Sequence, residues 1–376
     1  MFRHVIPLGR ILGIPVGLDY SWFLVFALLT WMLAVSYYPA EFNNWPVAVY
    51  WITGAVTAAM LFVSVLLHEL GHSLVALRYK IPVRRITLFI FGGVAQIASE
   101  PPSAKAEFLI AIAGPLVSLV LALAFFVLLP VLAPVAPLFG LAKYLAYING
   151  ALVVFNLIPG FPLDGGRVFR SIVWAIGHNF RRATLIAANV GRGFAFLFIF
   201  LGVWQMFSGN FGGGLWIAFI GWFLEVAASA QVHQLEFQDV LAGHKVLEAM
   251  NRSYGVVPAT LTLQQLVDEH VQTTGHRCFV VRHGDDAVGL LTLQLVRETP
   301  RAEWATTTVA DVMLPIEKVQ RIEPSTELSK AVREMDRVGV NQLPVVTDSK
   351  LAGMLTRDDV VTFLRTLREV GISPTH

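Results

Sequence analysis

Six long apolar segments constrain the fold of this 376-residue chain more than any other feature. They fall at about residues 14–37, 48–77, 106–133, 144–176, 184–208 and 214–233. Each reaches the roughly 20 residues that a helix needs to cross a bilayer, although Pro and Gly interrupt the fourth. Only 14% of the residues are charged, against about 25% in soluble proteins. We therefore expect a polytopic α-helical membrane protein with six transmembrane segments. The first segment is too long for a signal peptide and is expected to be retained.

The basic residues of the short loops predict the orientation. One set of loops carries nearly all of them: Arg3, Arg10, Arg78, Lys80, Arg84, Arg85, Lys105, Arg181 and Arg182. The other loops, around residues 41–45 and 208–214, carry no Lys or Arg, and Lys143 is the exception. Because basic loops stay in the cytoplasm, we expect a protein of the cell membrane with both termini cytoplasmic.

His68-Glu69-Leu70-Gly71-His72 lies inside the second apolar segment. A helix places residues i and i+4 on one face, so both imidazoles can bind one Zn²⁺, and Glu69 can act on a water molecule beside it. An acidic group near the middle of a membrane helix costs roughly 2.5–3.5 kcal/mol, so such groups persist mainly where they face a partner or a water-filled cavity. His68 precedes Arg78 by ten residues, which places it about 15 Å into the membrane. The motif predicts hydrolytic zinc chemistry within the membrane.

A catalytic zinc site usually has three protein ligands, and the fourth apolar segment offers a candidate for the third. Its stretch 156–167 contains two prolines and three glycines, so we expect it to be unwound where it meets water or is buried by protein. Asp164 falls on the cytoplasmic half, near the level of the histidines. The alternative is that Asp164 only caps a helix that begins at Gly165. Beside the histidine pair, we favour Asp164 as a ligand of one Zn²⁺ per chain.

These two motifs carry a family resemblance. His68-Glu69-x-x-His72, followed by Asn156-x-x-Pro159-x-x-Pro162-Leu163-Asp164-Gly165, resembles the site-2 protease family of intramembrane zinc metalloproteases. Phe91-Gly92-Gly93 and Ala113-Gly114-Pro115 also resemble features of that family, and the match covers about residues 1–236. No periplasmic PDZ domain is evident between the segments, unlike in the branch that carries one.

The resemblance implies a role for each motif residue. It implies zinc held by His68, His72 and Asp164, Glu69 as general base, and Asn156 near the scissile carbonyl. Without the resemblance, hydrogen bonding between helices would explain Asn156 equally well. The family also implies substrates that are single-pass membrane proteins, such as anti-sigma factors or other membrane-tethered regulators.

Residues 86–97 are rich in β-formers and too short for a seventh span. A substrate helix must open before cleavage, because its scissile amide is otherwise hydrogen-bonded within the helix. The strand region could pair with the opened substrate through its backbone. An ordinary packed hairpin explains the pattern equally well.

After about residue 237 the composition becomes soluble and charged. Two related units, at about 238–300 and 305–370, are offset by 64 positions, as Gly275 with Gly339, Gly289 with Gly353 and Thr292 with Thr356 show. Each predicts the order strand, helix, strand, strand, helix. The second unit resembles a CBS (cystathionine β-synthase) repeat, so we expect a C-terminal soluble α/β tandem CBS module over 237–376 and a membrane domain over 1–236.

Tandem CBS modules often bind adenine nucleotides, and the resemblance implies that a T-x-x-D element holds the ribose and phosphate. The second unit keeps Thr356 and Asp359, whereas the first has Thr292 but Leu295 in place of the Asp. A module that only mediates homodimerisation is nearly as well supported.

Composition and alternatives bound the function. The single Cys278 excludes an intramolecular disulfide and a Cys-rich metal site, and a net charge of +2 implies no nucleic-acid partner. We expect an intramembrane zinc endopeptidase that performs regulated intramembrane proteolysis, with the CBS module as regulator. A CBS-gated channel or transporter is the alternative, although the six segments contain no inverted repeat. An inactive homologue is the third possibility, against which the intact motif residues argue.

Overall fold

The computed structural model describes residues 5–90, 92–97, 99–274, 276–284, 286–347 and 350–369. Arg3, Phe91 and Gly275, which the sequence analysis used, lie outside the described residues. The chain forms two compact units, Met1–His233 and Gln234–His376.

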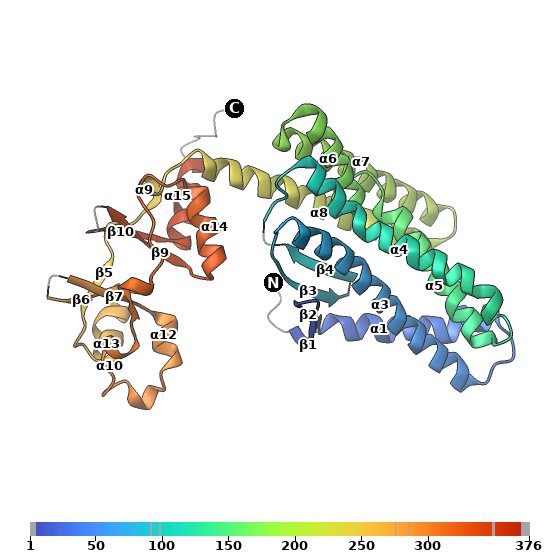
Figure 1. Ribbon diagram of the computed structural model, residues 1–376, viewed down its shortest axis with the longest axis horizontal. Helices are drawn as coiled ribbons and strands as arrows, with labels where there is room; N and C mark the ends of the chain where they lie inside the picture. The colour runs from blue at the N-terminus through green and yellow to red at the C-terminus, as the bar shows by residue number, and fades with distance from the viewer. Residues whose placement is uncertain are drawn as a thin grey trace. The chain divides into compact units, whose positions relative to one another are not determined.

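Six helices of the first unit are long and apolar enough to cross a membrane, so the prediction of six spans is confirmed. The first span, Ser21–Glu41, joins α1 (Ser21–Met32), a π-helical turn (Leu33–Tyr37) and α2 (Tyr38–Glu41). The others are α3 (Val47–Arg78), α4 (Ala104–Leu132), α5 (Ala136–Asn156), α7 (Phe180–Phe207) and α8 (Phe211–Ala242), of which Phe211–Phe237 is the apolar part (Figure 1).

Two predicted segments need correction. The first does not begin its helix at residue 14, because Ile14–Asp19 is a strand, β2. A strand buried on both faces is a continuous apolar run, which sequence alone does not separate from a helix. The fourth is not one span over 144–176. It divides into α5, a non-helical stretch at 157–163, and a separate short helix α6 (Asp164–Gly177).

A four-stranded sheet lies against the second span. Its order is β1 (Val5–Ile11), β2, β3 (Val83–Phe89) and β4 (Gly92–Ile97), with β2 and β3 parallel and the other pairs antiparallel. The β-structure predicted for residues 86–97 is present. Ile14, Val16 and Ile86 form a buried cluster with Leu70, which lies between the two histidines of α3. Packing therefore holds the sheet beside the H-E-x-x-H motif, with β4 at the sheet edge.

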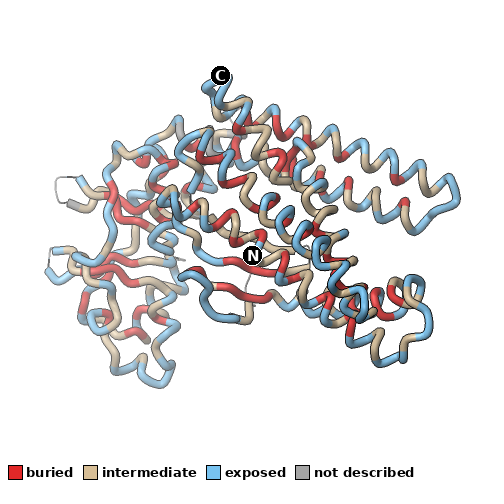
Figure 2. The backbone as a smooth tube through the Cα atoms, turned by 45° about the vertical axis from the view of Figure 1, so that its right-hand side comes forward, coloured by how far each residue is buried: buried red, intermediate tan, exposed pale blue. Residues whose placement is uncertain are grey.

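Buried and exposed positions alternate along the long helices of the first unit (Figure 2). The buried polar residues of α3, α4 and α5 include Ser64, Ser118 and Asn149. Lys143, the exception to the charge pattern, forms an ion pair with Glu41. Its charge is therefore neutralised by a partner at the end of the first span.

The second unit contains the two expected repeats. The first has a sheet of β5 (Gly255–Pro258), β6 (Cys278–His283), β7 (Asp286–Thr292) and β8 (Leu314–Pro315), with a helical stretch before β6 and α12 (Leu293–Glu298) after β7. The helical stretch runs from α10 (Leu263–Gln265) through a π-helical turn (Leu266–Val271) to α11 (Gln272–Thr274).

The second repeat has α14 (Leu328–Val338), β9 (Gln342–Thr347), β10 (Lys350–Thr356) and α15 (Arg357–Glu369). Its first strand is reduced to a single bridge between Ile322 and Val345. Short helices α9 (Val246–Ala249) and α13 (Val309–Val312) precede the repeats' first strands. One hydrophobic core joins Phe279 of the first repeat with Val309, and the other joins Leu343 of the second repeat with Leu241 and Val246. The segment before each repeat's first strand therefore packs into the core of the other repeat.

Candidate functional site

Three side chains from two helices converge inside the membrane unit. His68 and His72 lie one turn apart on α3, and their Nε2 atoms are 3.2 Å apart. Asp164, the first residue of α6, places Oδ2 at 3.1 Å from each of these nitrogens. A tetrahedral Zn²⁺ with bonds of about 2.0–2.1 Å holds its donors about 3.3 Å apart. The three atoms are therefore spaced as three corners of a zinc coordination shell, and the donor set suits that metal.

Contacts on the other side of each imidazole orient the two rings. His72 Nδ1 lies 2.7 Å from the carbonyl oxygen of Ile110, so this nitrogen is the N–H donor. Its Nε2 then carries the lone pair that faces the cluster. His68 Nδ1 lies 2.9 Å from Ser118 Oγ. Such outer contacts fix the tautomer and orientation of histidines that bind a metal.

Gly114 on α4 allows the histidines to lie where they do. A Cβ at this position would overlap both Nε2 atoms, and at none of the other glycines that the structure describes would a Cβ meet two of the converging side chains. The resemblance noted for Ala113-Gly114-Pro115 therefore has a steric reason in this structure: any larger residue on α4 would fill the space where the donors meet.

Asp164 does not serve as the helix cap that the sequence also allowed. The N-cap of α6 is Leu163, and no side-chain hydrogen bond caps this helix. The Asp164 carboxylate instead contacts the two histidines. The expected unwound stretch is present at 157–163, between α5 and α6.

Glu69 faces the edge of the sheet. Its Oε2 accepts a hydrogen bond of 3.0 Å from the backbone N–H of Ala95 in β4. A Cβ at Gly93 would lie 2.6 Å from Glu69 Cγ, so this glycine leaves room for the side chain. The side chain is half-buried, directly follows His68 in sequence, and is hydrogen-bonded to β4 at the edge of the sheet.

Asn156 is the last residue of α5 and is half-buried at the start of the unwound stretch. In the described part of the chain its side chain makes no hydrogen bond to another helix. Asn149, two turns earlier, has that role instead: its Nδ2 donates to Ser64 Oγ at 3.3 Å.

An ion pair that the sequence analysis did not single out joins α6 to α4. Arg170 donates to Oε1 of Glu107 through Nε at 2.7 Å and also through Nη2, and Glu107 is fully buried. The guanidinium lies over the rings of Phe161 and Phe180, at 4.9 and 4.6 Å from their centroids. A glutamate within the apolar run after Lys105 was the available signal. The pair fixes the helix that carries Asp164 against the helix that orients the histidines.

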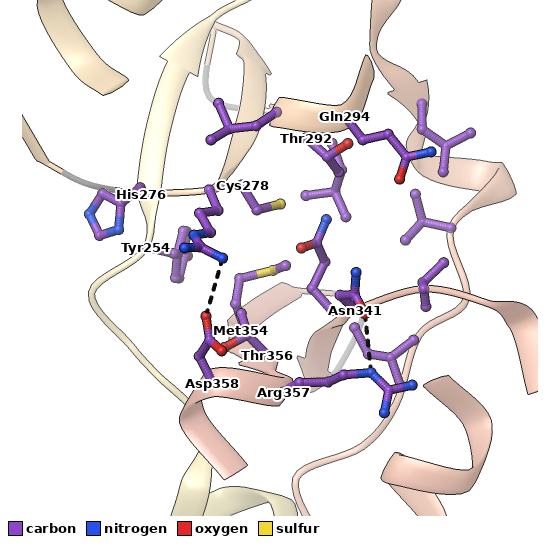
Figure 3. Close-up of a pocket in the computed structure, with 18 of the residues that line it drawn as sticks. Tyr254, His276, Cys278, Thr292, Gln294, Asn341, Met354, Thr356, Arg357 and Asp358 are labelled. Carbon is purple, nitrogen blue, oxygen red and sulfur yellow. Dashed lines mark hydrogen bonds and ion pairs between the residues drawn. The ribbon is translucent and has the colours of Figure 1, made fainter. Parts of the chain in front are cut away.

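A second candidate site lies in the C-terminal unit, where both repeats line a cavity of about 780 Å³ (Figure 3). Thr356 and Asp359 line it and bind each other: Thr356 Oγ1 donates to Asp359 Oδ2 at 2.6 Å, and the Asp359 N–H donates to Thr356 Oγ1 at 3.0 Å. From the first repeat, Thr292 lines the cavity and accepts a hydrogen bond from the N–H of Leu295.

Cationic groups also border this cavity. Arg277 of the first repeat pairs with Asp358 of the second at 3.9 Å, and Arg357 donates to Asn341 Oδ1 at 3.1 Å. Figure 3 draws both interactions as dashed lines, one ending on Asp358 and the other joining Arg357 to Asn341. The volume and the mixture of hydroxyl, carboxylate and guanidinium groups suit a ligand that carries both hydroxyls and negative charge.

Comparison with known proteins identifies the family. The model of "Peptidase family M50" matches residues 56–143 and 133–200, and the model of "CBS domain" matches 309–366. "Putative zinc metalloprotease Rip3" of Mycobacterium tuberculosis is 36% identical over 99% of this chain and 96% of its own length. The chain belongs to peptidase family M50. "Putative zinc metalloprotease sll0528" of Synechocystis sp. is 34% identical over 96% of each chain.

Among solved structures, "Site-2 Protease from Methanocaldococcus jannaschii" is 30% identical, covering 61% of this chain and 95% of its own, with a TM-score of 0.41. The family models and the curated relatives make the chain a zinc metalloprotease of peptidase family M50, a multi-pass membrane protein with a C-terminal CBS module, as the motifs predicted. Membership in a protease family favours this activity over the alternative of a CBS-gated channel or transporter.

Proposed function

We propose that this metalloprotease is an endopeptidase that cleaves its substrates within or next to their transmembrane segments. The observation that carries the proposal is the convergence of His68, His72 and Asp164 inside the membrane unit. His68 lies ten residues from Arg78, where α3 ends, which corresponds to about 15 Å along the helix axis. Peptide bonds at that depth belong to membrane-embedded segments.

The residues around the cluster divide the chemistry among them. His68, His72 and Asp164 would hold one Zn²⁺, which polarises a peptide carbonyl and activates water when bound. Glu69 acts as general base, accepts a proton at its carboxylate and delivers it to the leaving amine. The hydrogen bond from Ala95 supports this role, because it fixes the carboxylate without supplying a counter-charge. Asn156 offers its amide N–H to the developing oxyanion.

The edge strand supports a mode of substrate binding. β4 pairs with β3 on one side only, and its Ala95 N–H points to Glu69 on the other. An opened substrate segment that adds to this edge would bring its backbone beside the general base. This arrangement favours strand addition over a purely structural hairpin.

Glu69→Gln provides the test of the mechanism. The purified variant should keep one zinc per chain and its thermal stability, while cleavage of a fluorogenic peptide with one apolar segment of about 20 residues falls by at least roughly a hundredfold. Asp19→Asn is the control: this carboxylate at the end of β2 accepts hydrogen bonds from the N–H and the Oγ of Ser21 and is not one of the cluster residues. Near wild-type cleavage by Glu69→Gln would exclude Glu69 as the base.

We further propose that the CBS module over 237–376 binds an adenine nucleotide and so modulates cleavage by the membrane domain over 1–236. Thr356 and Asp359 would hold the ribose, Thr292 would contribute from the first repeat, and the cations at the rim would face phosphate. A ligand changes activity only if it prefers one arrangement of the module over another. Cleavage rates measured with and without AMP, ADP and ATP test this regulation.

The basic loops support a cell-membrane orientation with both termini and the CBS module in the cytoplasm. Single-pass membrane proteins such as anti-sigma factors are the proposed substrates, and the CBS module is the proposed surface for a homodimer. Accessibility of cysteines introduced in the loop 41–45 and in the loop 78–82 to a membrane-impermeant reagent tests the orientation. Labelling of the first loop in intact cells, and of the second only after permeabilisation, is expected.

A further inference from the structure

Arg167 differs from the other charged groups near the zinc cluster because no described residue forms a hydrogen bond or an ion pair with it. It lies on α6 three residues after Asp164, so the two side chains share a helix face. Many atoms surround it, yet it keeps some accessible surface. In the part of the chain that the structure describes, its guanidinium makes no hydrogen bond and no ion pair. Arg170, one turn further, is by contrast fully engaged with Glu107.

The carboxylates near Arg167 are already committed elsewhere. Asp164, Glu107 and Glu69 are close enough for electrostatic interaction with it. Asp164 contacts both histidines, Glu69 accepts from Ala95, and Oε1 of Glu107 accepts from Arg170. A guanidinium has five N–H donors and no acceptor, and in the described part of the chain none of the five is bonded, so they are available to a further acceptor.

An extended substrate offers such acceptors. When a strand adds to the edge of β4, alternate carbonyls point toward β4 and the remaining ones point away from it. Within a membrane, carbonyls without a donor are costly, so a donor on the side opposite β4 would stabilise the bound segment. Arg167 lies on α6, the helix that begins with Asp164 of the cluster, whereas β4 donates to Glu69, so α6 and β4 can each offer donors to a segment bound at the cluster.

We propose that Arg167 is a substrate-binding residue whose guanidinium donates to a main-chain carbonyl of the unwound substrate segment, on the side opposite β4. This proposal rests on the proposed intramembrane cleavage. The rival role is structural: Arg167 would only balance the charge of Glu107, whose Oε2 is buried without a hydrogen-bond partner.

Substrate affinity separates the two roles. In the inactive Glu69→Gln protein, the dissociation constant of the apolar peptide can be measured by fluorescence anisotropy without turnover. Adding Arg167→Gln should raise this constant on the order of tenfold, the usual effect of losing a hydrogen bond from a charged donor, and Arg167→Lys should restore part of the affinity. Zinc content should stay at one per chain. Lys105→Gln, which removes an exposed cation of α4, is the matched control and should leave the affinity unchanged.

Peptides with one backbone amide replaced by an ester identify the bond involved, since an ester carbonyl is a weaker acceptor. At one position in the peptide, the ester should raise the dissociation constant for the Glu69→Gln protein, which has Arg167. The same ester should not change the dissociation constant for the protein that also carries Arg167→Gln. Equal ester effects in both proteins, or unchanged affinity in Arg167→Gln and Arg167→Lys, would overturn the proposal and leave intramembrane cleavage intact. If the zinc-loaded wild-type protein cleaves none of the apolar peptides, the proposed intramembrane cleavage itself is contradicted.

Discussion

The zinc cluster and the CBS cavity hold their functional groups in different ways. In the cluster, each histidine has a second contact behind it, with Ser118 or with the carbonyl of Ile110, and Gly114 leaves no spare volume. In the cavity, Thr356 and Asp359 bind each other and face about 780 Å³ of open space. The first arrangement fixes donor positions for an ion, and the second leaves room for a larger ligand to adjust.

The difference has a physical origin in the surroundings. Inside the membrane unit a polar group without a partner is expensive, and each of the three side chains of the zinc cluster has polar contacts with its neighbours. At the rim of the cavity, water can satisfy groups such as Arg277, whose side chain is 79% exposed. We therefore expect substitutions at the cluster to have all-or-none effects and substitutions at the cavity to have graded ones.

The largest expected effect is on zinc content. Asp164→Ala removes one of three donors, so zinc per chain should fall from about one to near zero, and cleavage should be lost. Elemental analysis of protein purified without chelator measures the zinc. Asp19→Ala removes a carboxylate of the same unit that accepts hydrogen bonds from Ser21 and is not one of the three donors, so this variant should keep its zinc. Full zinc occupancy in Asp164→Ala would show that Asp164 is not a zinc ligand. The zinc cluster would then not be the fixed three-donor site that we contrast with the CBS cavity.

The next largest effect tests the packing of the cluster. Gly114→Ala places a methyl group where both Nε2 atoms lie, so the histidines must move, and zinc affinity should fall by roughly 10- to 100-fold, as for other changes that misorient metal ligands. Competition with a chromophoric chelator measures this affinity. Gly150→Ala in α5 is the control, because no atom lies within 4 Å of the added Cβ. Equal affinities in the two variants would show that the cluster tolerates changes in shape.

Sequence predicted the cluster well because its chemistry is local. His68 and His72 are related by one helical turn. The glycines and prolines of 156–167 predict an interruption of the helix, next to which Asp164 lies. The six spans followed from segment length alone. The strand at Ile14–Asp19 did not, because apolar residues buried on both faces give a strand the composition of a helix.

Contacts between distant segments were beyond the sequence. The sequence around Ser118 and Ile110 does not indicate that each of them orients a histidine, because both positions fit an ordinary apolar helix. The pair Glu107 and Arg170 is separated by 63 residues, and only the tertiary fold brings α4 and α6 together. The same holds for Ala95, whose N–H reaches Glu69 through the position of a sheet edge.

A smaller, graded effect is expected in the CBS cavity. Asp359→Ala should weaken binding of an adenine nucleotide to the full-length protein by about tenfold, because one charged acceptor for a ribose hydroxyl is lost. Calorimetry in detergent with AMP, ADP and ATP measures the affinities. Asp358→Ala is the matched control: this neighbouring carboxylate also lines the cavity, but it is 82% exposed and its pair with Arg277 is long, at 3.9 Å, so the affinity should change less than about twofold.

If none of the three nucleotides produces heat on titration, the module is a dimerisation element and not a nucleotide-binding one.

The difference between the two repeats allows a further test of where the nucleotide binds. In the first repeat Leu295 packs against the hydrophobic core where the T-x-x-D element would have its Asp. Leu295→Asp should therefore destabilise this repeat rather than create a second binding site, and a second equivalent of bound nucleotide would contradict that reading of the core.

The smallest expected effect concerns the reactivity of Cys278, which lines the cavity. Burial raises the pKa of its thiol to about 12. Because only the thiolate reacts with iodoacetamide, the alkylation rate should rise with pH up to at least pH 10 without a plateau, whereas an exposed thiol with a pKa of about 8.5 levels off above pH 9. The chain has one cysteine, so mass spectrometry of the intact protein reads this site alone.

Nucleotide should slow this alkylation several-fold in wild type at pH 9, because the ligand would occupy the cavity that Cys278 borders. Asp359→Ala should lose most of that protection at the same nucleotide concentration, and Asp358→Ala should keep it. The urea-unfolded chain is the reference, since its thiol should titrate near the ordinary value. A plateau of the alkylation rate near pH 9 in the folded protein would mean that water reaches the Cys278 thiol in the cavity. The difference in solvent access between the open cavity and the closed zinc cluster would then be larger than the structure indicates.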